Sequence, residues 1–209
     1  MIHAAPSQSR LRANVTRIQA LSFTWMFMLV MPVIVPYLAS HDLGMDRVFQ
    51  LQAIFAITIV LLEVPSGYIS DLLGRRRCLL LAGLLHGLAF TVLFWADSFM
   101  GFVVFELLAG GGVCFYSGTD VALLYDSLEA LGDGGGKRRL LGRRLMWMQG
   151  GETTAALLTA GLLGASLGDF GLEDVVFFNA LVGWIPFIVV LSLVDVPRPT
   201  LDRHSHLHN

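Results

Sequence analysis

Six long apolar runs follow one another along the chain, and they constrain its fold more than any other feature. They cover residues 18–38, 49–69, 78–95, 100–124, 145–167 and 175–194. A helix needs about 20 apolar residues to cross the hydrocarbon core of a membrane. Of the residues, 55% are hydrophobic and 14% charged, whereas an ordinary soluble domain has about a quarter charged. The sequence therefore predicts an all-α integral membrane protein with six transmembrane helices.

The basic residues predict how these helices are oriented. Thirteen of the fourteen Lys and Arg fall before the first run, in the second and fourth connections, or after the last run, and Arg47 is the exception. Cytosolic loops retain Lys and Arg, so both termini are expected in the cytosol. The chain then divides into a cytosolic N-tail (1–17), a six-helix bundle (18–196) and a cytosolic C-tail or start of a linker (197–209).

A compact charged turn joins the second and third runs. Gly67 leaves room for a close approach of helices, and Gly74 can adopt turn conformations that other residues resist. Asp71 and Arg75 are four residues apart, and a guanidinium binds carboxylates in a fork geometry. Asp126, at the end of the fourth run, is a natural second acceptor for Arg75.

The pattern Gly67-x-x-x-Asp71-x-x-Gly74-Arg75-Arg76, between the second and third runs, resembles the signature loop of the major facilitator superfamily of secondary transporters. Residues 117–128 also resemble the end of the fourth helix in one branch of its permeases. The resemblance implies an inverted three-plus-three repeat in each six-helix half, and two such halves around a central cavity. This chain covers the N-terminal half.

The resemblance also implies a role for the charged turn. Asp71, Arg75 and Asp126 would form a charge relay, with Gly67 and Gly74, that latches the cytosolic helix ends in one of two states and meets a helix of the other half. The alternative is that the arginines act as orientation signals and contact lipid headgroups. We favour that alternative for Arg76 and Arg77.

Acids inside apolar runs are the candidate substrate and proton sites. Charged groups in a membrane span are costly and usually face the protein interior or a water-filled path. There are four of them: Glu63, Glu106, Asp120 and Glu152. Glu106, Ser117 and Asp120 would share a stripe about 80° wide on one continuous helix.

The depth of the acids gives a second pattern. Glu63, Asp120 and Glu152 each lie about seven residues, or roughly 10 Å, from the expected cytosolic end of their helices. Three carboxyl groups at one depth favour proton coupling or capture of a cationic substrate. The alternatives are hydrogen bonds between helices and pairing with Arg143 or Arg144 reaching inward.

The remaining signals are weaker. Trp25, Tyr116, Ser117 and Gln149 are candidates for lining a cavity. The sequence shows no arrangement of nucleophile and base and no phosphate-binding loop, so no enzyme activity, cofactor or metal site is predicted. A net charge of −2 also gives no reason to expect nucleic acid as a partner.

The leading hypothesis is a half-size, proton-coupled transporter of a small molecule, in the lipid bilayer of the bacterial cytoplasmic membrane. Transport would then need a second six-helix half, either another copy or a separate chain. One alternative is a membrane scaffold or assembly subunit derived from the same bundle. Another is a truncated twelve-helix permease, since Pro197-Arg198-Pro199 resembles the start of a linker between halves.

Overall fold

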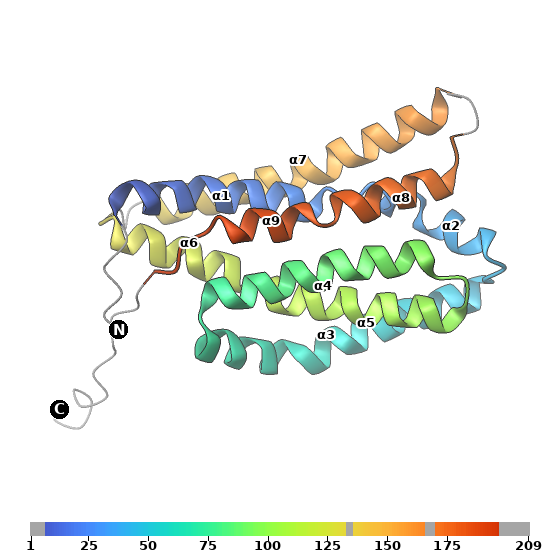
Figure 1. Ribbon diagram of the computed structural model, residues 1–209, viewed down its shortest axis with the longest axis horizontal. Helices are drawn as coiled ribbons and strands as arrows, with labels where there is room; N and C mark the ends of the chain where they lie inside the picture. The colour runs from blue at the N-terminus through green and yellow to red at the C-terminus, as the bar shows by residue number, and fades with distance from the viewer. Residues whose placement is uncertain (1–6, 133–135, 166–169, 197–209) are drawn as a thin grey trace.

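The computed structural model describes residues 7–132, 136–165 and 170–196, and every regular element in these ranges is a helix. The elements form an elongated bundle (Figure 1). Their bounds are α1 (Gln8–Met26), η1 (Met31–Val33), α2 (Ile34–Ser40), α3 (Met45–Leu73), α4 (Arg75–Trp95), α5 (Phe99–Tyr116), α6 (Thr119–Ala130), α7 (Lys137–Gly164), α8 (Leu172–Val182) and α9 (Ile185–Leu191). The expected all-α class is confirmed.

Five segments of the described chain are long and apolar enough to cross a membrane. They correspond to the first, second, third, fourth and sixth predicted runs. The segments are Gln8–Ser40, Met45–Leu73, Arg75–Trp95, Phe99–Ala130 and Leu172–Leu191. The first begins at Gln8, so the helix takes up part of the polar tail that the sequence placed before residue 18. The structure thus supports a multi-pass membrane protein.

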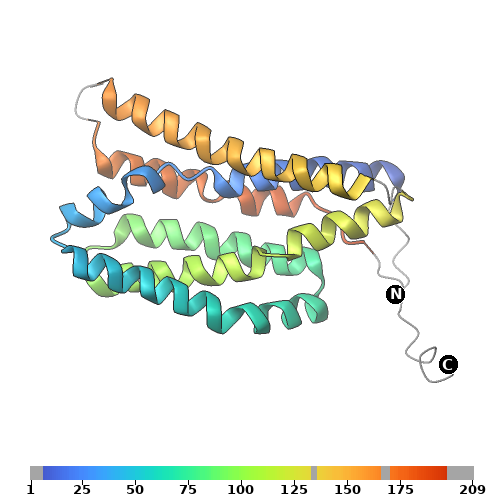
Figure 2. The same cartoon turned by 180° about the vertical axis from the view of Figure 1, so that it is seen from behind.

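The fifth predicted span differs from the others. It forms α7, which has 28 residues and lies beside α1 in both views of the bundle (Figures 1 and 2). It is nevertheless absent from the five segments apolar enough to cross a membrane. Gln149, Glu152, Thr153 and Thr154 interrupt its apolar character. The bundle therefore has five apolar spans and one more polar helix of comparable length.

Three of the five apolar segments are broken into two helical parts. The first breaks at residues 27–30, just before Pro32, and the last breaks at Gly183 and Trp184, just before Pro186. Proline has no N–H to continue a helix, which accounts for both positions. The fourth segment breaks at Ser117 and Gly118, where Gly118 has a φ of +77°. Glycine adopts this left-handed conformation without steric cost.

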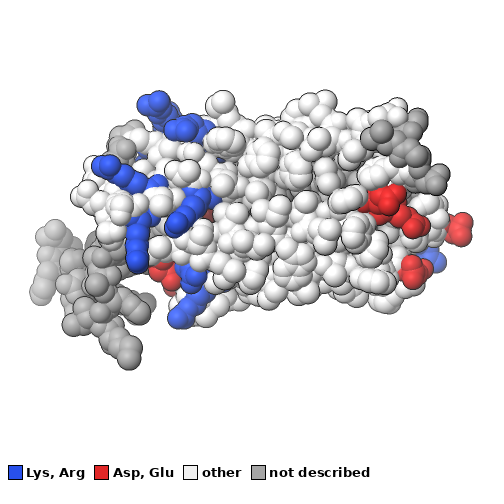
Figure 3. All heavy atoms as spheres, turned by 45° about the horizontal axis from the view of Figure 1, so that its top comes forward, with Lys and Arg blue, Asp and Glu red and all other residues white. Residues whose placement is uncertain are grey.

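Basic side chains are distributed unevenly along the long axis of the bundle. Most Lys and Arg side chains lie at the end where α1 begins and α6 lies, some of them beside acids, whereas the charged side chains at the opposite end are mostly acids (Figure 3). We call these the basic end and the acidic end. The first and last described residues both lie at the basic end (Figure 1). This distribution is the one expected for cytosolic termini, whose position relative to a membrane stays a prediction.

The buried core has two main clusters with a cavity between them. Leu51, Phe90 and Phe102 belong to a cluster built from α2, α3, α4 and α5 toward the acidic end. Ile18 and Leu124 belong to a second cluster built from α1, α4, α6 and α9 toward the basic end. The cavity between them is lined from both clusters, and it positions the candidate site described next.

Candidate functional site

The charged turn at the basic end brings together the residues that the sequence singled out. Arg75 Nη1 lies 3.1 Å from Asp71 Oδ1, and Arg75 Nε lies 3.8 Å from Asp126 Oδ2. Gly74 connects α3 to α4 with a φ of +92°, which is favourable for glycine. Arg75 also donates a hydrogen bond of 3.2 Å to the hydroxyl of Ser70. One guanidinium therefore bridges the ends of α3, α4 and α6.

Gly67 does not have the surroundings that the sequence suggested. Apart from its chain neighbours and the backbone of its own helix, no described atom lies within 4 Å of the position that a Cβ would occupy there. The close helix approach expected at Gly67 is thus not made within this bundle. Gly67 instead faces outward on α3, beside the exposed side chains of Val64 and Tyr68.

Asp120 forms a buried ion pair. Arg144 Nε lies 2.5 Å from Asp120 Oδ2, and the Asp120 side chain is fully buried. The sequence analysis gave this pairing only as an alternative. It placed Arg144 in a polar loop, from which the side chain would have to reach inward. The structure begins α7 at Lys137, so Arg144 lies two turns into the helix and points at α6. Asp120 is therefore engaged with a cation.

The predicted polar stripe on the fourth run is wrong. The helix ends at Tyr116 and restarts at Thr119, so Glu106 and Asp120 belong to different helices. Ser117 is exposed, whereas Glu106 and Asp120 are buried. The left-handed Gly118 rotates α6 away from the direction of α5, and this rotation breaks the helical periodicity on which the stripe depended.

The three acids predicted at one depth do not face a common internal space. Glu63 on α3 and Glu152 on α7 are both exposed at the surface of the bundle, while Asp120 is fully buried. Position along a helix gives depth but not the side to which a residue points. The acid that does face an internal space is Glu106, on α5.

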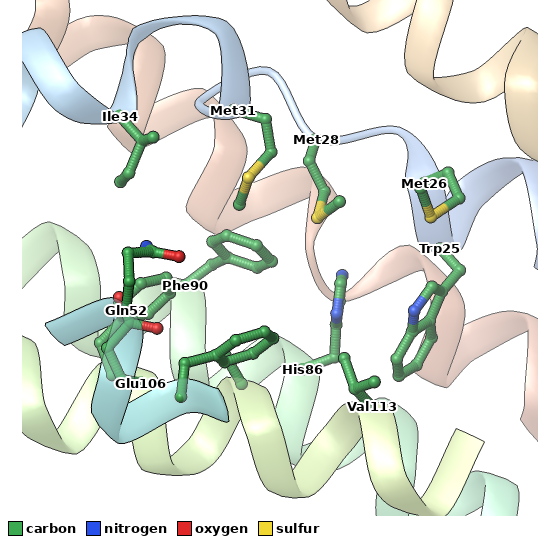
Figure 4. A pocket seen from close by; sticks show the side chains of 13 residues that line it. Trp25, Met26, Met28, Met31, Ile34, Gln52, His86, Phe90, Glu106 and Val113 are labelled. Carbon is green, nitrogen blue, oxygen red and sulfur yellow. The ribbon is translucent and has the colours of Figure 1, made fainter. Parts of the chain in front are cut away.

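That internal space is a cavity of about 280 Å³ between α1, α3, α4 and α5. Gln52 and Glu106 lie at one end of it and Trp25 and Met26 toward the other, with His86 between them (Figure 4). Its walls also include Phe55, Phe90 and Phe105, and the three methionines Met26, Met28 and Met31. Of the four predicted cavity residues, Trp25 lines this space.

The ring of Tyr116 stacks on the ring of Trp25. The two rings stack with centroids 4.0 Å apart and planes at 6°. The guanidinium carbon of Arg144 lies 5.9 Å from the centroid of the Tyr116 ring. Tyr116 therefore contacts both the cavity wall and the buried ion pair. The other two predicted cavity residues, Ser117 and Gln149, are exposed and lie outside the cavity.

Sequence reasoning missed several of these residues. Gln52 and His86 line the cavity, and the spacing Met26-x-Met28-x-x-Met31 marks the broken part of the first segment. A glutamine and several methionines in apolar runs were available signals. The sequence does not show that they come together, because they lie on different helices and meet only in the folded bundle.

The sequence also did not predict a second group of residues, which binds the backbone at the end of α9. Arg76 donates hydrogen bonds of 2.7 Å to the Leu193 carbonyl and 3.0 Å to the Leu191 carbonyl. The buried Asn14 side chain accepts from the Val194 N–H at 3.0 Å and donates to the Val194 carbonyl at 2.8 Å. Arg76 is thus a helix-capping residue as well as a positive charge at this end.

The helices and the partly open cavity define a multi-pass membrane protein with a space suited to a small molecule. Residues 18–208 match the sequence model of the Major Facilitator Superfamily. The chain belongs to this superfamily, whose members are transporters rather than enzymes. No match was found among curated proteins.

Proposed function

We propose that the chain is a half-size secondary transporter that moves a small molecule by alternating access, driven by protons. It would act in the cytoplasmic membrane of a bacterium, together with a second six-helix half. The family match supports the transporter class. The observation that carries the proposal is the arrangement of α6, a separate short helix that forms ion pairs with Arg75 and Arg144 of two neighbouring helices.

Side chains of three neighbouring helices form ion pairs or a hydrogen bond with α6. Asp126 pairs with Arg75 of α4, and Asp120 pairs with Arg144 of α7. The hydroxyl of Thr119 donates a hydrogen bond of 3.1 Å to Ser70 of α3. The left-handed Gly118 lies just before these contacts. A helix that is hinged at one end and held by ion pairs is suited to two discrete positions, which is what alternating access needs.

The outer face of α3 supports the need for a second half. This helix is less buried than the other apolar spans, and Val60, Val64 and Tyr68 expose most of their side chains. Val60, Val64 and Gly67 follow the i, i+4, i+7 spacing of one helical face that leads to Asp71. A small residue within an apolar stripe suits close packing of membrane helices. We propose that the second half packs here.

A growth assay with the intact protein tests the transport proposal. Cells with and without the protein are compared on a panel of toxic small molecules, with and without a protonophore. We expect a difference for at least one compound that disappears with the protonophore and with Arg75→Gln or Asp126→Asn. Arg77→Gln is the control, since Arg77 is exposed in the same turn and outside these ion pairs. Wild-type behaviour of the two variants at normal membrane levels would contradict the proposal and favour the scaffold alternative.

Photo-crosslinking tests the second half separately. A photoreactive amino acid at Val64 should give one discrete adduct in membranes, while the same residue at Ile188, exposed on α9, should not. Mass spectrometry of the adduct shows whether the partner is another copy or a separate chain. An equal pattern at both positions would contradict docking on α3.

A further inference from the structure

We infer that the cavity between α1, α3, α4 and α5 binds a lipophilic organic monocation, with Glu106 as its counter-charge. This inference rests on the proposed transport function and deepens it by naming the substrate class. It rests on the charges and the wall chemistry of this one cavity.

The balance of charge in the cavity is the first argument. Glu106 is 4% exposed, and no Lys or Arg is among the residues that line the space. None of the ion pairs found among the described residues includes the Glu106 carboxyl group. The other buried acid, Asp120, has Arg144 beside it. A lone ionised carboxylate is costly in such a place, and a cation entering the cavity would offset that cost.

The wall chemistry is the second argument. Phe55, Phe90 and Phe105 are aromatic residues in the wall, and aromatic rings attract cations through their ring quadrupoles. The thioethers of Met26, Met28 and Met31 are polarisable and adapt to irregular shapes. A hydrated inorganic cation would find few oxygen ligands here, because hard cations take several oxygens. An organic cation matches both the apolar walls and the single charge.

The same residues argue against other substrate classes. An anion would face the Glu106 carboxyl group without a basic partner. A sugar-like molecule needs many hydrogen bonds, but Gln52, His86 and Glu106 are the polar side chains among the lining residues. The His86 ring is itself engaged between Trp25, at 4.4 Å, and Phe90, at 4.9 Å between centroids. Few donors and acceptors therefore remain for a polyol.

The proposal also defines an exchange of charge. When the cavity is empty, the Glu106 carboxyl group holds a proton and is neutral. When the monocation binds, the O–H bond of that group breaks, the proton passes to water, and the carboxylate stays beside the cation. One proton leaves for each cation that binds, so the charge inside the cavity does not change. This exchange is the simplest form of coupling between a cation and a proton gradient.

Binding of methyltriphenylphosphonium to the purified full chain in detergent is the test. Triphenylphosphine oxide is its neutral near-isostere, which separates charge from shape. We expect the cation to bind the wild type at least about tenfold more tightly than the neutral compound, and Glu106→Gln to lose most of that preference. We also expect release of one proton per bound cation in weakly buffered solution, and none for Glu106→Gln.

Two further variants keep the result interpretable. Glu63→Gln removes an exposed acid in the membrane span of α3 and should bind like the wild type. Glu106→Asp keeps the charge and should retain the preference for the cation. If Glu106→Gln still binds the neutral compound, it is folded. An unchanged cation preference in Glu106→Gln, or equal binding of both compounds to the wild type, would overturn the inference.

Failure here and failure of the transport proposal give different results. The binding assay needs no partner, no membrane and no proton gradient. If the Glu106-dependent binding is found but no transport, the site stands and the proposed function fails. If the growth assay shows Arg75-dependent transport but Glu106→Gln has no effect on binding, only the substrate class is wrong.

Discussion

Trp25 and Tyr116 stack face to face between the cavity and the buried ion pair of Asp120 and Arg144. Trp25 forms part of the cavity wall. The guanidinium carbon of Arg144 lies 5.9 Å from the centroid of the Tyr116 ring. A molecule in the cavity is therefore separated from α6 by a single pair of stacked rings. The stacked rings thus lie between the cavity wall and the ion pair that holds α6, the helix that carries both Asp120 and Asp126.

The first prediction concerns the buried pair. Asp120→Asn leaves the Arg144 guanidinium buried without its counter-charge, which typically costs about 3–5 kcal/mol. Thermal unfolding of the detergent-solubilised protein should show a large loss of stability. Arg144→Gln should behave similarly, and the double variant should recover part of the loss, because the two changes are coupled. Additive losses in the double variant would show that the two side chains act independently.

The second prediction concerns the break between α5 and α6. Gly118→Ala places a Cβ on a left-handed residue, which typically costs about 1–2 kcal/mol. No atom lies within 4 Å of that Cβ, so the cost comes from the backbone alone. Gly142→Ala is the control: Gly142 is in α7, also with no atom within 4 Å, and alanine there should stabilise the helix slightly. Thermal unfolding of the two variants should move in opposite directions.

The third prediction concerns the partly exposed ion pair between Arg75 and Asp126 of α6. Asp126→Asn removes the ion pair with Arg75, and pairs of this kind are worth about 0–1 kcal/mol. Overall stability should hardly change, whereas amide hydrogen exchange in α6 should become faster. Glu129→Gln is the matched control on the same helix, because Glu129 pairs at 3.9 Å with Lys137 at the surface. Equal exchange in both variants would contradict a special role for Asp126.

The fourth prediction concerns the clamp on the end of α9. Asn14 is fully buried and makes two hydrogen bonds with the backbone of Val194. Asn14→Ala leaves that N–H and carbonyl without these partners, which typically costs about 1–3 kcal/mol for each buried group. The loss should appear in thermal unfolding and as faster cleavage by protease after α9. Asn14→Asp keeps the acceptor for the Val194 N–H and should be less damaging to that bond.

The sequence predicted the helical membrane class well, because apolar runs separated by charged turns report directly on burial in lipid. It also placed Asp71, Arg75 and Asp126 near one another, since the i, i+4 spacing and the order of the runs bring them to one end. It did not predict the orientation of Glu63 and Glu152. A membrane helix that is apolar on all sides gives no polar face from which the inward direction can be inferred.

Two other differences have local causes. The break at Gly118 depends on a backbone conformation that many glycines can adopt but few do, and glycines are frequent in this run. The pairing of Arg144 depends on where α7 begins, and the start of a helix is its least certain feature in a sequence. Both differences concern α6, so the candidate site could be predicted only in part.

The two ion pairs that α6 forms with arginines differ in their exposure to water, and this difference has a consequence for regulation. At physiological ionic strength, charges in water are screened over about 8 Å, so salt weakens an exposed pair far more than a buried one. Arg75 and Asp126 are partly open to solvent, whereas Asp120 and Arg144 are enclosed. Ions and anionic lipid headgroups at the basic end can therefore weaken the pair of Arg75 with Asp126 and leave the pair of Asp120 with Arg144 intact. In the movement proposed for α6, the Asp120 end would stay fixed, and the local ionic environment would adjust how readily Asp126 separates from Arg75.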